Sequence, residues 1–196
     1  MSGFAVISDE TDRKYTVQSR VVPRMREIDL CARVSKHMFD NDCSDGVKSF
    51  PEASLKLGET EFYSNAHSRE LTDPILDSGI AMVRAMLQFA GFTVNTDGKF
   101  KRYGNTKPTD ITVESFGIAR LIRDSKAENY IFKGLNASEI DAIRLTALNG
   151  NKGVAHLTTH ETKSISLDQL SEACLAMNKV LNNWLVKPIL GCDASF

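Results

Sequence analysis

An apolar stripe near the carboxyl end constrains the fold more than any other feature of the sequence. Its members follow one another at alternating steps of three and four residues: Leu167, Leu170, Cys174, Met177, Leu181 and Trp184. This spacing puts all of them on one face of an α-helix. The segment Ser166-Leu-Asp-Gln169 before it matches a capping box, which marks a helix start. The stripe predicts a helix that packs on another helix, within the chain or in a second copy, with Trp184 as a core or dimer anchor.

Similar spacing predicts further helices along the chain. One covers about residues 23–39, with Pro23 in its first turn, where the missing N–H costs nothing. A second carries Leu76, Ile80, Val83 and Leu87 and ends at Gly91. A third covers about residues 113–124, and a fourth begins at the capping box of Asn136 and Glu139.

Two segments interrupt these helices. Residues 40–69 mix Asn, Asp, Ser, Gly and Pro without a sustained period, so we expect a long irregular connection, with at most a short helical piece near Leu55. Residues 92–104 contain two short extended stretches around a Thr-Asp-Gly turn, which predicts a β-hairpin insertion. The expected fold is all-α, or mainly α with a small β-hairpin.

Size and composition bound the class of protein. A chain of 196 residues, 42% hydrophobic and 25% charged, is expected to form one globular domain over residues 1–196. Its net charge of −1 argues against binding nucleic acid through a bulk positive field, but permits a local basic patch. The amino terminus lacks a basic lead and no segment is apolar enough to span a bilayer, so we expect a cytoplasmic protein without a membrane contact.

The four cysteines, Cys31, Cys43, Cys174 and Cys192, include no CxxC pair, and we expect them to be reduced structural residues. A glycine-rich phosphate loop and a Gly-x-Ser-x-Gly elbow are also missing from the sequence. Nucleotide hydrolysis, serine hydrolase chemistry and zinc-finger binding are therefore poor interpretations.

The segment Asn149-Gly-Asn-Lys-Gly-Val-Ala-His-Leu157 carries the candidate chemistry. If the fourth helix continues through it, Asn149, Lys152, His156 and His160 share one face, away from the buried stripe. Glycine at two intervening positions allows another backbone or a ligand to approach closely. This face would group side chains that hydrogen-bond or transfer protons.

The stretch Asn151-Lys-Gly-Val-Ala-His-Leu resembles the motif of HEPN-domain proteins, a superfamily of small helical bundles. Many members are metal-independent RNases of toxin, phage-defence or RNA-processing systems, and two copies usually dimerise so that both motifs face a shared cleft. Their active motif is an arginine, four to six intervening residues and a histidine. The resemblance covers roughly residues 70–186 in helix order and implies that residues 113–186 contain the motif-bearing helices.

Carried over to this chain, the resemblance makes His156 the family histidine and puts Lys152 or Asn151 near the position of the arginine. The window for that arginine contains Asn149, Gly150 and Asn151 instead. In RNA cleavage, His156 would act as base or acid and Lys152 would supply positive charge, although lysine lacks the bidentate guanidinium fork. Asn149 and Asn151 would orient phosphate oxygens.

Other interpretations of His156 remain open. The side chain would serve equally well as a helix-end cap or in an interhelical contact. With His160 and Glu161 it would offer two or three metal ligands, but a stable zinc site usually needs a fourth donor, so we expect neither a metal nor another cofactor.

A separate candidate lies in the expected hairpin. Lys99, Lys101 and Arg102 alternate with Phe100 and Tyr103, which suits RNA binding because cations contact phosphates and rings stack on bases. The sequence thus predicts a HEPN-like protein, an endoribonuclease or a degenerate relative of one. We expect it to form a homodimer and to bind RNA. The alternative is a non-catalytic helical module that assembles with or regulates a protein partner.

Overall fold

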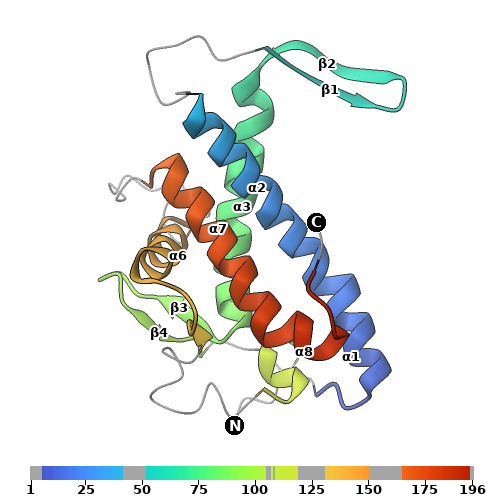
Figure 1. Cartoon of the computed structure of the whole chain (residues 1–196), viewed down its shortest axis with the longest axis vertical. Helices are drawn as coiled ribbons and strands as arrows, with labels where there is room; N and C mark the ends of the chain where they lie inside the picture. The colour runs from blue at the N-terminus through green and yellow to red at the C-terminus, as the bar shows by residue number, and fades with distance from the viewer. Residues whose placement is uncertain are drawn as a thin grey trace.

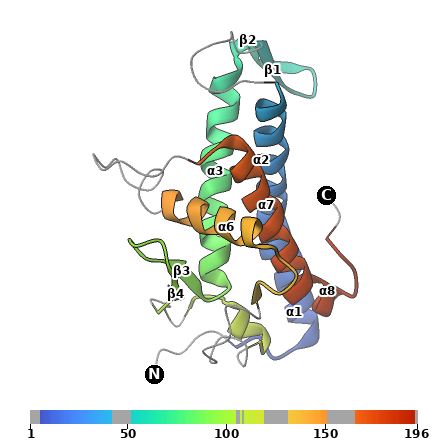
Figure 2. The ribbon, with the colours of Figure 1, turned by 60° about the vertical axis from the view of Figure 1, so that its left-hand side comes forward.

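The computed structural model of the chain describes residues 6–41, 52–104, 107, 109–118, 131–150 and 165–194. These residues form a bundle of long helices with two small antiparallel strand pairs (Figure 1). The helices α2, α3 and α7 run along the long axis, and α6 lies across them (Figure 2). The prediction of a mainly α-helical fold with a small β-hairpin is confirmed.

The first helical segment is longer than the sequence predicts. It comprises α1 (Glu10–Thr16), a π-helical turn η1 (Val17–Val21) and α2 (Val22–Asp40), which follow one another without a break. Asp9 begins it, because its side chain accepts the N–H groups of Thr11 and Asp12 at 2.8 and 3.1 Å. The prediction that the helix starts at Pro23 is therefore wrong.

The π-helical turn explains how a proline is tolerated inside this helix. Pro23 cannot donate the hydrogen bond that an α-helix requires, and its ring crowds the preceding turn. Just before it, the N–H of Val22 bonds to the carbonyl of Val17, five residues back. The wider turn accommodates the proline, and the helix continues on both sides of it.

The other long helices have the expected ends. The helix α3 (Ser68–Phe89) is followed by Gly91, which adopts a left-handed φ of 93°. Asn136 and Ser166 cap α6 (Ala137–Asn149) and α7 (Leu167–Leu181) in reciprocal capping boxes. Both capping predictions are confirmed. A π-helical turn η4 (Asn182–Val186) and the short α8 (Lys187–Leu190) complete the carboxyl-terminal part.

The apolar stripe of α7 faces the interior of its own chain. This helix packs against α2, α6 and α3, and four members of the stripe are fully buried: Leu170, Cys174, Met177 and Leu181. Trp184 is half-buried against the same core, and its Nε1 donates to the carbonyl of Ile131 at 2.8 Å. Of the two arrangements that the stripe allowed, the structure contains the one within the chain, with Trp184 as a core residue.

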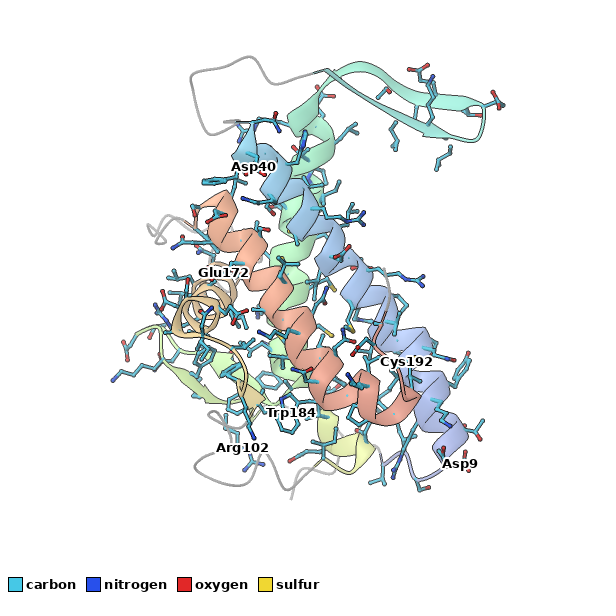
Figure 3. All side chains as sticks on the ribbon, viewed as in Figure 1. Asp9, Asp40, Arg102, Glu172, Trp184 and Cys192 are labelled. Carbon is cyan, nitrogen blue, oxygen red and sulfur yellow. The ribbon has the colours of Figure 1, made fainter. Side chains whose placement is uncertain are left out.

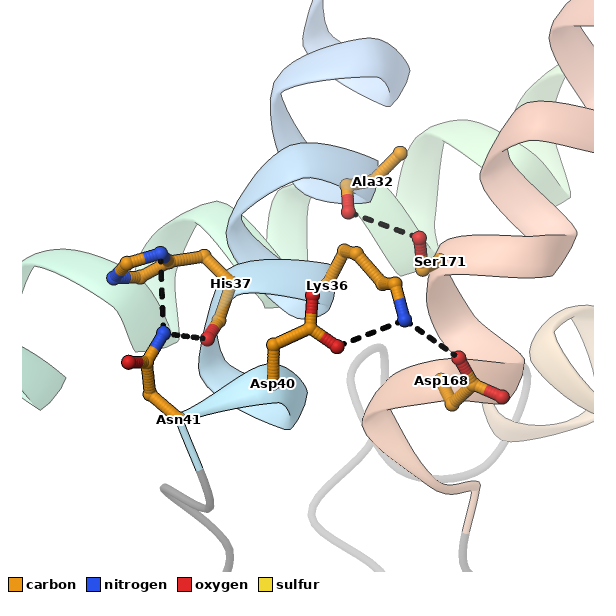
Figure 4. A network of polar contacts seen from close by, with 7 residues as sticks. All are labelled: Ala32, Lys36, His37, Asp40, Asn41, Asp168 and Ser171. Carbon is orange, nitrogen blue, oxygen red and sulfur yellow. Dashed lines mark hydrogen bonds and ion pairs between the residues drawn. The ribbon is translucent and has the colours of Figure 1, made fainter.

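Polar contacts fix α2 against α7. The hydroxyl of Ser171 donates to the carbonyl of Ala32 at 3.0 Å inside the interface, and the Lys36 amine lies 2.9 Å from Asp40 and 3.8 Å from Asp168 at its edge (Figure 4). Further along α7, the amide of buried Asn178 donates to the carbonyl of Met25 at 3.0 Å. The two buried bonds define the register of the helices, because a shift along the axis would leave polar groups unpaired.

The predicted hairpin in residues 92–104 is present. Strand β3 (Phe92–Val94) pairs antiparallel with β4 (Phe100–Arg102) beside α6. The prediction of an irregular connection over 40–69 is wrong for residues 52–67, which form β1 (Glu52–Leu57) and β2 (Thr60–His67). Gly58, with a φ of 59°, stands in the turn between them, and this second hairpin projects from the end of the bundle (Figure 1).

The expected helix over 113–124 is absent from the described part of that segment. Residues Val113–Phe116 form one 3₁₀ turn, and Gly117 ends it with a φ of 80°. The left-handed conformation of Gly117 is typical of a residue that ends a helical turn. Among the described residues, no helix is long and apolar enough to cross a membrane.

Candidate functional site

The structure reaches only the first part of the candidate motif. Asn151, Lys152 and His156 lie outside the described residues. Asn149 is described, is only 8% exposed and donates its amide to the carbonyl of Leu145 at 3.0 Å. The expectation that Asn149 lies away from the buried stripe is wrong, because the last turn of α6 is buried on that side as well.

Gly150 follows α6 and lies tightly against α3. A Cβ atom there would lie 3.3 Å from Cγ2 of Ile80 and 3.4 Å from Cβ of Arg84. The first of these distances is tighter than nine in ten real Cβ contacts. A side chain at this position would make Ile80 shift by a few tenths of an ångström, so the glycine permits the start of the motif to lie close to α3.

Arg84 brings a guanidinium to the same point. Its Nη1 donates to the carbonyl of Gly150 at 3.2 Å, while its buried Nε has no hydrogen-bond partner among the described residues. The contact joins positions that are 66 residues apart in the chain, so the motif spacing gave no indication of it. An arginine from α3 thus lies where the motif itself has none.

The cations of the second candidate are exposed. Lys99, Lys101 and Arg102 lie on β4 or just before it. Arg102, labelled in Figure 3, lies 3.7 Å from the Glu114 carboxylate. The neighbouring ring of Phe100 packs on Phe132, with centroids 5.0 Å apart. Phe100 is half-buried and packs against the core through this contact.

The hairpin is fastened to α6. The Nη1 atom of Arg144 donates to the carbonyl of Gly98 at 3.2 Å, and the side chain of Asn95 accepts the N–H of Lys99 at 2.7 Å within the turn. The same guanidinium is paired with Asp141 on α6. The exposed cations therefore stand on a hairpin with a fixed position relative to the helix that leads into the motif.

A pocket opens close to the hairpin. It has a volume of about 510 Å³ and lies between the π-helical turn with the start of α2, the last turns of α3, and the segment that follows β4. Tyr103, the residue after β4, lines this pocket, and its N–H donates to the carbonyl of Gly91 at 2.8 Å. The sequence pattern gave no sign of this pocket, because its walls come from three distant segments.

Metal binding has no support in the described part of the chain. No group of three or more His, Cys, Asp and Glu side chains there is arranged to hold an ion. His160 and Glu161, the other members of the considered metal set, lie outside the described residues together with His156.

Comparison of the chain with models of protein families, with curated proteins and with solved structures gives no match.

Proposed function

We propose that this chain is a HEPN-like protein that binds RNA and cleaves it without a metal ion. The observation that carries the proposal is the hydrogen bond of Arg84 to Gly150. Gly150 precedes His156 by five intervening residues, a spacing that lies within the window for the arginine of the family motif. The guanidinium from α3 would take the part of that arginine.

The chemistry needs a proton acceptor and a fixed cation. His156 removes the proton of an RNA 2′-hydroxyl, and the oxygen attacks the adjoining phosphorus. The bond from phosphorus to the 5′-oxygen breaks, which leaves a 2′,3′-cyclic phosphate, and water supplies the proton that the 5′-oxygen takes up. Negative charge builds up on the phosphate oxygens during this step, and Arg84 with Lys152 would stabilise it.

The surroundings suit an RNA strand. The exposed cations Lys99, Lys101 and Arg102 stand on the hairpin that Arg144 fastens to α6. They would contact backbone phosphates, a contribution that decreases as the salt concentration rises. In keeping with the family, we propose a cytoplasmic homodimer that acts in a toxin or phage-defence type of system.

The direct test is cleavage of a mixed RNA pool in EDTA by the purified full chain. His156→Ala should abolish cutting, and Arg84→Gln should slow it by about 10²–10³-fold, the usual effect of removing one donor from a charge-stabilising site. Arg84→Lys should recover part of the rate. Light scattering of the same samples measures the molar mass in solution and so tests whether the protein is a homodimer.

Two variants provide matched controls. His37→Ala removes an exposed histidine of α2, and Arg33→Gln removes an exposed arginine of the same helix. Both should cut RNA at the wild-type rate, and all variants should show the wild-type circular dichroism and unfolding midpoint. Cutting that survives His156→Ala, or no cutting by the wild type, contradicts the proposal.

One observation favours the alternative of a non-catalytic module that binds a protein partner. The β1–β2 hairpin carries Leu55, Leu57 and Phe62 exposed to solvent, with Phe62 58% exposed. A two-stranded hairpin of this kind gains stability when a partner covers it. A wild type that does not cut RNA but binds a partner through these side chains would support this function.

A further inference from the structure

The pocket beside the hairpin has the size and composition of a ligand site. Its volume of about 510 Å³ lies within the range of roughly 300–1,000 Å³ that is typical of small-molecule pockets. Its lining combines cationic, hydroxyl, amide and aromatic side chains, and none of its lining residues belongs to the candidate motif.

Two arginines form its cationic side. Arg20 and Arg24 lie four residues apart, one helical turn, and both line the pocket. Among the described residues no carboxylate forms an ion pair with either side chain, and Arg24 donates to the carbonyl of Arg20. Like charges at this spacing repel each other. A bound anion removes that repulsion, and a dianion matches both charges.

The single acid of the lining does not cancel this pair. Asp110 uses its Oδ2 to accept the backbone N–H of Lys107 at 2.7 Å. One carboxylate against two guanidiniums leaves a net positive lining. Guanidinium groups bind phosphate oxygens through paired, charge-assisted hydrogen bonds, which is the strongest form of this contact.

A threonine of the segment after β4 also lines the pocket. Thr112 is 5% exposed, and it forms the capping box of the 3₁₀ turn, in which its N–H donates to Oγ of Ser115 at 3.1 Å. Its Oγ1 is buried, so the polar contacts available to a ligand come from the arginines.

Another part of the lining is aromatic and apolar. Tyr103 is half-buried with its backbone bonded to Gly91, and Phe89 is held edge-to-face against Phe116, with ring centroids 6.2 Å apart. Met86 and Ile111 complete this side. A planar ring suits these surfaces, because stacking of a base on an aromatic side chain contributes about 1–3 kcal/mol.

We propose that this pocket binds a nucleoside monophosphate unit. Arg20 and Arg24 hold its phosphate, and Tyr103 contacts its base. The unit is either a free nucleotide or the 5′-phosphorylated end of an RNA strand, which Lys101 and Arg102 on the adjoining strand would guide towards Tyr103. The inference does not depend on RNA cleavage by His156.

Equilibrium binding to the purified full chain tests the proposal. The probes are adenosine 5′-monophosphate, adenosine, and a 2′-O-methyl hexanucleotide with either a 5′-phosphate or a 5′-hydroxyl, which cannot be cleaved through a 2′-hydroxyl. We expect each phosphorylated probe that binds to lose at least tenfold in affinity when its phosphate is removed. Binding of the mononucleotide assigns the free source, and binding of the oligonucleotide alone assigns the RNA end.

Variants connect that binding to the pocket. Arg24→Gln and Arg20→Gln should each lower the affinity for the phosphorylated probe at least tenfold, and Tyr103→Ala should lower it several-fold. Arg26 is an exposed arginine of α2 outside the pocket lining, and Arg26→Gln should leave the affinity unchanged. The proposal is overturned if no probe binds at millimolar concentration, if the hydroxyl and phosphate forms bind equally, or if Arg26→Gln has the effect of Arg24→Gln. An inactive His156→Ala variant that still binds the probes separates this site from the cleavage site.

Discussion

The α2–α7 interface and the β1–β2 hairpin contain similar apolar side chains in opposite surroundings. Met25 and Met177 are completely buried between the helices, whereas Leu57 on the hairpin is 66% exposed. In residues 54–62 every side chain is exposed. The same kind of residue therefore contributes to stability in one region and remains available for contact in the other, and burial, rather than residue type, decides which.

The sharpest contrast should appear in thiol reactivity. The pKa of the Cys174 thiol is raised by its hydrogen bond to Cys31 and by burial, which lowers its thiolate fraction at pH 8. Cys31 is also buried, whereas Cys192 is exposed. We expect Cys31 and Cys174 to react with iodoacetamide more than about 10³-fold more slowly than Cys192, because they must await opening of the bundle.

Peptide mass mapping after timed labelling measures each cysteine separately. Denaturant should bring the three rates close together. Labelling of Cys31 at the rate of Cys192 in the native protein would show that the interface opens readily, so that it would not be the closed region of this comparison.

Truncation inside the interface should have the largest effect on stability. Met177→Ala leaves a cavity between α7 and its neighbours and should lower the free energy of unfolding by about 2–5 kcal/mol, measured by urea denaturation. Leu175→Ala on the exposed side of the same helix is the control and should change it by less than about 0.5 kcal/mol. Equal losses in the two variants would contradict the packing.

A smaller loss should follow from adding one methyl group at the contact of α2 with α3. A Cβ atom at Gly79 would lie 2.1 Å from Sγ and 2.3 Å from Cβ of Cys31. Gly79→Ala should cost about 1–3 kcal/mol through overpacking, although alanine favours a helix by about 1 kcal/mol. In Gly104→Ala the new Cβ would meet no atom within 4 Å, so this control should be neutral in the same urea experiment. A stabilised Gly79→Ala would show that the helices do not meet here.

The smallest effect should come from the hairpin. Leu57→Ala removes an exposed side chain and should change the free energy of unfolding by less than about 0.5 kcal/mol. The urea midpoint and the slope of the transition should both stay at the wild-type values. A loss comparable to that of Met177→Ala would mean that the side chain of Leu57 is buried in solution. Unfolding that depends on protein concentration would then show that a second copy of the chain packs on the hairpin.

The parts of the fold that follow from local chemistry were predictable. The capping boxes at Asn136 and Ser166 join residues three positions apart, and the stop at Gly91 depends on one backbone conformation. Each signal is contained in a few neighbouring residues. The starts of α6 and α7 and the end of α3 follow from these signals.

The parts that depend on distant contacts were not predictable. Pro23 is typical of a helix start, but the π-helical turn before it lets the helix continue from Glu10. In the β1–β2 hairpin, residues 54–62 show no alternation of buried and exposed side chains. The pattern that would distinguish a strand from a loop is therefore missing there.

The same distinction between local signals and distant contacts holds for the candidate site. The exposed cations at Lys99, Lys101 and Arg102 follow from the hairpin pattern and its turn. The meeting of Arg84 with Gly150 and the grouping of Arg20 with Thr112 in one pocket require the packed helices, since spacing along the chain cannot reveal either.

The turn of the β1–β2 hairpin also makes the protein easy to equip with a reporter. Gly58 has open space around it, and the hairpin stands away from the packed helices (Figure 1). Exposed turns of this kind tolerate insertions well, because no buried backbone or side chain has to move. A peptide tag or a small fluorescent domain placed between Gly58 and Glu59 would leave both the Arg84 region and the Arg20 pocket unchanged. The same tagged protein could then be used in cells to compare variants of either site.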